Sequence, residues 1–157
     1  MAAWLIIMPL LAVLALNLPW KGRREGPACW VGLALCLLQI GLALQPKAFF
    51  WQTSGLWLER LLIFTPLVDQ LALVMFLAIG IVGGAALLVC CYTPHCADNR
   101  FMVINLVILA LAGMNGVVLA NDLFSLYVFL EITAVASYIL IAVEKKRDAF
   151  EGAFKYL

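Results

Sequence analysis

The sequence is poor in charge. Of its 157 residues only 12% are Asp, Glu, Lys or Arg, whereas 66% are hydrophobic and the mean hydropathy is +1.08. Ordinary soluble domains carry about 25% charged residues. The formal net charge of +1 also gives no general affinity for nucleic acid. The composition therefore predicts an integral membrane protein whose surroundings are the lipid bilayer.

Motifs for redox chemistry are lacking as well. The sequence has no iron–sulfur spacing, no Gly-rich nucleotide loop and no haem attachment sequence. Its five cysteines are an odd number, and four of them lie in or beside apolar runs, so a disulfide framework is not expected. Cys90, Cys91, His95 and Cys96 lack the two-plus-two spacing of zinc sites. We expect no metal and no cofactor, with the cysteines packing as small apolar residues.

A secretory signal is another absence. The apolar N-terminus has no basic region before it and no small-residue cleavage site after it. It is therefore interpreted as a first membrane span that is retained.

Long apolar runs dominate what is present. About 17 to 25 apolar residues cross the hydrocarbon core as a helix. The sequence predicts an all-α membrane protein, a single transmembrane domain over residues 1–157, with spans at about 1–18, 28–44, 67–92, 101–120 and 123–143. Prolines stand at most of the span ends, where they break no interior backbone bond.

The distribution of basic residues predicts the orientation. The first loop, the third loop and the C-terminal tail together hold eight Lys and Arg, whereas the second loop holds Lys47 and Arg60 and the short fourth loop holds none. Basic residues favour the cytoplasmic side. The N-terminus is thus predicted outside and the C-terminus inside.

Small residues recur at a spacing that favours helix contact. Gly80 and Gly84, and likewise Ala112 and Gly116, are four residues apart. This spacing lets two helix backbones approach closely, so it predicts packing and not chemistry.

Glu131 is the most informative polar residue. It stands about nine residues into the fifth run, so at about 1.5 Å per residue it lies roughly 12 Å deep. A carboxylate at this depth costs several kcal/mol unless it is protonated, paired or hydrated. Intramembrane carboxyls usually mark ion or proton paths, and a single inter-helix hydrogen bond is the structural alternative.

The neighbours of Glu131 support a site. On a helix, Tyr127, Glu131 and Tyr138 share one face with Ala134, and Ser137 lies to its side with Thr133. A carboxylate in such a setting is switched by the presence or absence of a nearby cation.

Further polar residues have structural alternatives. Asp69 follows Pro66 at the start of a span, where an N-terminal cap is as good an explanation as a functional role. Asn115 and Asn105 are expected to make inter-helix hydrogen bonds, with the lining of a water path as the alternative. Asp122 is expected to cap the fifth span.

These residues resemble a known family. The stretch "GMNGVVLANDLFSLYVFLEITAVASYILIA" and the following "AFEGAFKYL" closely resemble the antiporter-like, proton-conducting membrane subunits of respiratory complex I, Mrp-type Na⁺/H⁺ antiporters and membrane-bound group 4 hydrogenases. "LVDQLALVM" resembles the start of that family's third helix. The resemblance covers essentially the whole chain.

The resemblance implies a larger architecture. Family members have about fourteen helices with inverted five-helix repeats and broken helices at a midplane path. Glu131 matches the glutamate of the family's ion-pair switch, and Lys155 matches a lysine entering the sixth helix. The partner lysine expected in the seventh helix is not in this sequence, so the chain is expected to be truncated, naturally split or a partial homologue.

Two functions follow from these observations. The first is a subunit of a cation- or proton-translocating complex in the inner (cytoplasmic) membrane, in which Glu131 is the switch and other membrane subunits supply the partner lysine and any electron transfer. The alternative is a structural or assembly subunit that conducts nothing. The chain itself is not expected to be a redox enzyme.

Overall fold

The computed structural model describes residues 4–18, 25–44, 68–93, 99–143 and 147–156. Every regular element in these ranges is a helix. The helices are α1 (Trp4–Asn17), α2 (Glu25–Leu44), α5 (Gln70–Tyr92), α6 (Arg100–Leu119), α7 (Leu123–Ala142) and α8 (Arg147–Tyr156). The predicted second loop, residues 45–66, lies outside the described residues.

Four of these helices are long and apolar enough to cross a membrane: α2, α5, α6 and α7. Helix α1 is equally apolar but has 14 residues, or roughly 21 Å at about 1.5 Å per residue. The predicted all-α membrane fold is therefore confirmed, with four candidate spans and one shorter apolar helix. Helix α8 differs from the rest, because it is short, polar and amphipathic.

Three of the described helix starts follow local rules. Asp69 caps α5 by accepting a hydrogen bond of 2.7 Å from the Ala72 N–H, and Asp122 caps α7 in the same way from the Ser125 N–H, also at 2.7 Å. The cap expected of Asp122 is confirmed, and of the two explanations open for Asp69 the structure shows the cap. Helix α2 begins three residues before its predicted start, because Pro27 falls in the first turn, where a missing N–H costs nothing.

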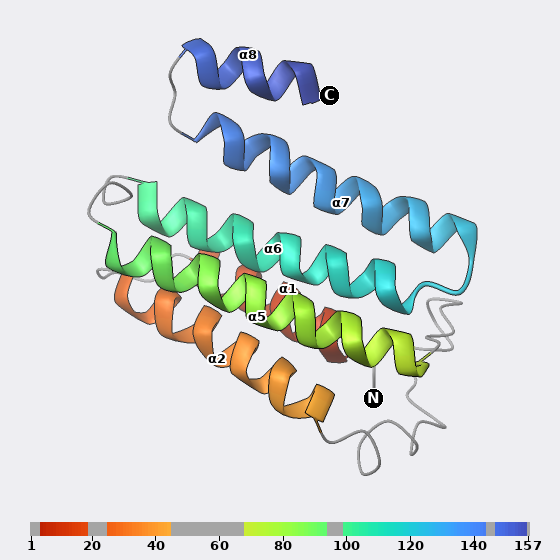
Figure 1. The fold of residues 1–157 in the computed structure, drawn as a ribbon. Helices are drawn as coiled ribbons and strands as arrows, with labels where there is room; N and C mark the ends of the chain where they lie inside the picture. Colours follow the sequence, from red (N-terminus) through yellow and green to blue (C-terminus); the bar gives the residue numbers. More distant parts are fainter. Residues whose placement is uncertain (1–3, 19–24, 45–67, 94–98, 144–146, 157) are drawn as a thin grey trace.

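Helix α6 is the centre of the bundle. It packs against α1, α2, α5 and α7, and α8 packs on α7 (Figure 1). Nine of its twenty residues are buried, whereas α7 has a single buried residue, Ala136. Helix α7 thus lies between α6 and α8, which pack on opposite sides of it, while most of its surface is uncovered within the described part of the chain (Figure 1).

Glycines bring α6 close to its neighbours. A Cβ on Gly116 would meet the ring of Phe129, and one on Gly113 would meet the side chain and backbone of Thr133. On α5, a Cβ on Gly80 would lie 2.8 Å from Ile40 Cγ1. The close approach predicted at Gly80 and Gly116 is confirmed. A Cβ on Gly84 would make only ordinary contact. The neighbouring Gly83 is tighter than Gly84, because a Cβ there would lie 2.9 Å from Leu111 Cδ1.

A disulfide joins Cys29 of α2 to Cys91 of α5, with their Cα atoms 6.3 Å apart. The expectation that all five cysteines pack as thiols is therefore wrong for this pair. Its cause is tertiary: the start of α2 and the end of α5 meet at the same end of the bundle. Cys36 and Cys90 are buried, and Cys96 lies outside the described residues.

Candidate functional site

Glu131 lies on the face of α7 that turns away from α6. Phe129, Thr133 and Ala136 form the side that packs against α6, since the first two contact its glycines and the third is 1% exposed. At 100° per residue, Glu131 falls nearly opposite to them. Its side chain is exposed, and within the described residues no cation pairs with it.

Tyr127 is a polar neighbour of Glu131. It stands one turn earlier on the same face of α7, where side chains four residues apart lie next to each other. Tyr127 is 62% exposed, so the pair as a whole faces outward. Tyr138 lies two turns beyond Glu131 on the same face and is partly buried. Tyr127, Glu131 and Tyr138 thus form a row of polar side chains along one outer face of a candidate span.

The hydroxyl groups of Thr133 and Ser137, in the same part of α7, are used within their own helix. The Thr133 hydroxyl donates to the Phe129 carbonyl at 2.9 Å, and the Ser137 hydroxyl donates to the Thr133 carbonyl at 2.8 Å. Both are bonds back to the preceding turn, which satisfy the hydroxyls without a partner helix. Ser137 is thus occupied locally rather than by Glu131.

Lys155 lies on α8 and is engaged by its own helix. Its Nζ is 2.8 Å from a carboxylate oxygen of Glu151, one turn earlier, and both side chains are exposed, at 74% and 63%. An exposed pair of this kind contributes at most about 1 kcal/mol. The structure therefore does not bring Lys155 into an ion pair with Glu131.

Asn115 belongs to a second polar cluster, buried in the bundle. Asn115 and Gln39 of α2 are 0% and 2% exposed, and their amides exchange two hydrogen bonds, of 2.9 and 3.0 Å. The Gln39 Nε2 also donates to the Phe76 carbonyl at 2.9 Å, and the Asn115 Nδ2 donates to the Leu5 carbonyl at 3.1 Å. These bonds connect α1, α2, α5 and α6 at one point.

The Leu5 carbonyl is available because of Pro9. A helix carbonyl normally accepts from the N–H four residues later, and Pro9 has none. The Asn115 amide replaces that missing bond. Because a lone carbonyl in an apolar interior is costly, this explains why a buried amide stands in the apolar helix α6. The inter-helix hydrogen bonding expected of Asn115 is confirmed.

Sequence reasoning missed Gln39 and Pro9. Both were visible as signals: a single glutamine inside the apolar run "LALCLLQIGLAL", and a proline in the interior of the first run. Asn105, for which the same bonding was expected, behaves differently, because its buried Oδ1 has no hydrogen-bond partner among the described residues.

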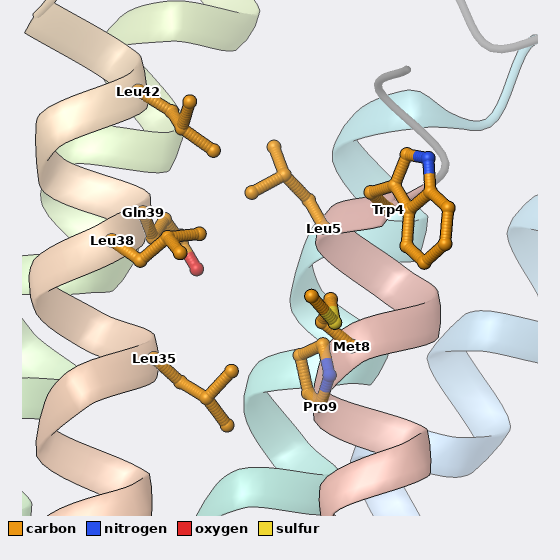
Figure 2. A pocket seen from close by; sticks show the side chains of 8 residues that line it. All are labelled: Trp4, Leu5, Met8, Pro9, Leu35, Leu38, Gln39 and Leu42. Atoms are coloured by element: carbon orange, nitrogen blue, oxygen red, sulfur yellow. The ribbon is translucent and has the colours of Figure 1, made fainter.

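An apolar groove of about 290 Å³ separates α1 from α2 beside the amide pair. In Figure 2, Leu35, Leu38 and Leu42 of α2 face Leu5 and Met8 of α1 across it, with Gln39 between the leucines. The amide nitrogen of Gln39 already donates twice and its oxygen accepts once. The groove thus has an apolar lining, and the Gln39 amide beside it already makes its hydrogen bonds within the bundle.

Asp69 and Asp122 act at helix starts. Both are exposed, and each accepts a backbone hydrogen bond from the first turn of its helix. At Asp122, the backbone N–H and the hydroxyl of Ser125 lower the pKa of the carboxyl. Among the described residues, no three His, Cys, Asp or Glu side chains gather where they would hold a metal ion.

The four long apolar helices are those of a multi-pass membrane protein. Comparison with known proteins then places it among relatives. The chain is 33% identical over 89 residues to the D subunit of the Na⁺/H⁺ antiporter of Alkalihalophilus pseudofirmus, a match that covers 57% of this chain and 18% of that protein. No family model matches the chain.

Two relatives cover more of the chain. The N subunit of the NADH-quinone oxidoreductase of Maricaulis maris is 32% identical over 146 residues, covering 80% of this chain and 30% of that protein. The corresponding protein of Laribacter hongkongensis is 28% identical over 158 residues, covering 96% of this chain and 30% of its own length. The chain is therefore a homologue of the antiporter-like subunits of complex I and Mrp antiporters, and its matches span less than a third of each of these relatives.

Proposed function

We propose that this chain is a membrane subunit of a cation- or proton-translocating complex of the inner (cytoplasmic) membrane, and that Glu131 is its intramembrane switch carboxylate. The observation that carries the proposal is the position of Glu131: mid-span, on the uncovered face of α7, with no cation beside it among the described residues. A carboxylate in this position needs a polar or charged partner. Among the described residues of α7, the polar side chain one turn away on the same face is Tyr127.

The ion-pair partner of Glu131 is a cation from outside the described helices. A carboxyl stem is too short to reach either membrane surface from about 12 Å deep. A lysine on a helix of the same complex would pair with Glu131 and release it when the cation moves away. The homology to membrane subunits of a Na⁺/H⁺ antiporter and of NADH-quinone oxidoreductase supports such an assembly.

Glu131→Gln tests the role of ionisation. Gln keeps the shape and the hydrogen bonding of Glu but cannot ionise. In vesicles holding the native complex, we expect Glu131→Gln to reduce proton or sodium translocation at least tenfold while the composition of the complex is unchanged, and Glu131→Asp to retain part of the activity. Glu151→Gln, on an exposed carboxylate outside the spans, is the matched control. Parent-like pumping by Glu131→Gln would show that the switch role is wrong.

A non-conducting assembly role is the second candidate. It is favoured by the buried amide pair, whose donors are directed to two helix carbonyls and to each other, an arrangement that fastens four helices and leaves no donor for a water path. If this role is the correct one, Glu131→Gln will pump normally and Asn115 variants will fail to assemble.

A further inference from the structure

A second cavity, of about 520 Å³, opens at the end of the bundle where α2 and α6 begin and α5 ends. Its lining comes from three helices: Gly26, Pro27, Cys29, Trp30 and Leu33 of α2, Cys91 and Tyr92 of α5, and Arg100 of α6. The Cys29–Cys91 disulfide ties two of these helices together in its wall. The cavity is distant in the sequence from Glu131 and plays no part in the function proposed above.

Arg100 gives this cavity its charge. It is the one charged side chain in the described lining. Its Nη2 donates to the Thr93 carbonyl at 3.3 Å, whereas its Nε is buried without a hydrogen-bond partner. No carboxylate among the described residues forms an ion pair with it. A guanidinium has five N–H donors in a fork that matches phosphate oxygens, and among the described residues the bond from Nη2 to the Thr93 carbonyl uses one of them.

The surrounding backbone favours an anion at the same place. Helices α2 and α6 both start here, and the first N–H groups of a helix have no partner within it. Asn99, the N-cap of α6, makes no side-chain capping bond. The end of α5 has the opposite polarity, and Arg100 already neutralises it by its bond to Thr93.

Two aromatic side chains point to a lipid as the source of the anion. Trp30 and Tyr92, which line the cavity, are 75% and 81% exposed and stand near the ends of candidate spans. Such rings lie at the headgroup level of a bilayer. Leu33 continues the lining one turn further into the span, as an acyl chain requires.

We propose that this cavity binds the phosphate group of an anionic phospholipid, with Arg100 as its ligand and Trp30 and Tyr92 beside the headgroup. The same end of the bundle is the one that the basic loops predict to be cytoplasmic, where anionic lipids attract Lys and Arg. Free phosphate shares the chemistry of the headgroup, so the experiment separates the two sources.

The full chain is purified in detergent and titrated with phosphatidylglycerol, phosphatidylcholine or inorganic phosphate, and bound molecules are counted by native mass spectrometry. We expect one phosphatidylglycerol to be retained at least tenfold more tightly than phosphatidylcholine. Arg100→Gln should abolish this preference and Arg100→Lys should keep part of it. Arg147→Gln is the matched control, because Arg147 is exposed on α8, away from the cavity lining.

Folding is checked in each variant by the Cys29–Cys91 link, read as protection of both residues from alkylation. Should Arg100→Gln not fold, Trp30→Leu provides the second test, with an expected loss of several-fold in phosphatidylglycerol retention and the charge unchanged. Equal retention of phosphatidylglycerol by parent, Arg100→Gln and Trp30→Leu would overturn the proposal. So would saturation of the site by inorganic phosphate at concentrations that leave phosphatidylglycerol binding unaffected.

Discussion

At the residue scale, the most constrained group is the amide pair of Gln39 and Asn115. Each amide donates one hydrogen bond to the other amide and one to a helix carbonyl, and both side chains are buried. In lipid there is little hydrophobic force between helices, so packing and such bonds hold the bundle together. The two apolar clusters of the bundle lie to either side of the pair along α2 and α6.

The pair predicts a specific stability pattern. Asn115→Leu leaves the Leu5 carbonyl and part of the Gln39 amide unbonded, and we expect it to lower the free energy of unfolding by about 2–4 kcal/mol. The double variant Gln39→Leu/Asn115→Leu should be less destabilised than the sum of the two single variants, because it removes both amides. Denaturant titration of the full chain in mixed micelles measures these values. Strict additivity would contradict the mutual bonding.

The stability cost of Asn115→Leu should depend on Pro9. In Pro9→Ala the new backbone N–H can bond to the Leu5 carbonyl, so Asn115→Leu should then cost about 1 kcal/mol less than in the parent. An unchanged cost would show that Asn115 is not needed for the carbonyl that Pro9 leaves open.

At the element scale, the contact of α6 with α7 depends on glycine. A Cβ on Gly113 would lie 3.1 Å from the Thr133 backbone N and 3.3 Å from the Phe129 carbonyl oxygen, both of which are backbone atoms that cannot rotate away. The face of α7 that carries Glu131 is held in its orientation by this contact. Helix–helix packing in α6 and α7 therefore positions the candidate site.

Gly113→Ala should accordingly push α7 away from α6. We expect a loss of about 1–3 kcal/mol in unfolding free energy and a lower translocation activity of the assembled complex. Gly41→Ala on α2 is the matched control, since nothing lies within 4 Å of a Cβ at Gly41. There the better helix propensity of Ala should leave stability unchanged or raise it by up to about 1 kcal/mol. Equal effects of the two substitutions would contradict the close packing at Gly113.

Sequence reasoning reached the elements better than their contacts. The apolar runs located α2, α5, α6 and α7 to within three residues, because length and hydropathy decide a span. The partner of each polar group is a tertiary fact: Cys29 meets Cys91 across 62 positions, and Gln39 meets Asn115 across 76. A local sequence pattern cannot predict contacts between residues so far apart in the sequence. Glu131 was found because a carboxylate in an apolar run is itself the signal.

At the scale of the whole molecule, the ends of the helices sort into two groups. The starts of α2 and α6 meet the ends of α5 and α7, as the Cys29–Cys91 disulfide and the hydrogen bond of 3.1 Å from Asn99 Nδ2 to the Val143 carbonyl require. In Figure 1 this is the end from which the chain also continues into α8. Consecutive candidate spans thus run in alternate directions, as a bilayer demands.

The basic residues predict which end of this bundle faces the cytoplasm. Eight of the ten Lys and Arg belong to the predicted first loop, third loop and C-terminal tail, or stand at their edges. The described helix ends next to these segments, which are the starts of α2 and α6 and the end of α7, lie at the end of the bundle that carries the disulfide. Moving basic residues across the membrane is unfavourable, so this end should face the cytoplasm. In a background without native cysteines, Lys21→Cys should react with a membrane-impermeant thiol reagent only from the cytoplasmic side, and Gln52→Cys only from the opposite side. Positions 21 and 52 lie outside the described residues, and Lys155→Cys, on the exposed part of α8, is the control that must label with Lys21→Cys. Labelling of Lys21→Cys and Gln52→Cys from one side would show that the chain does not cross the bilayer between them.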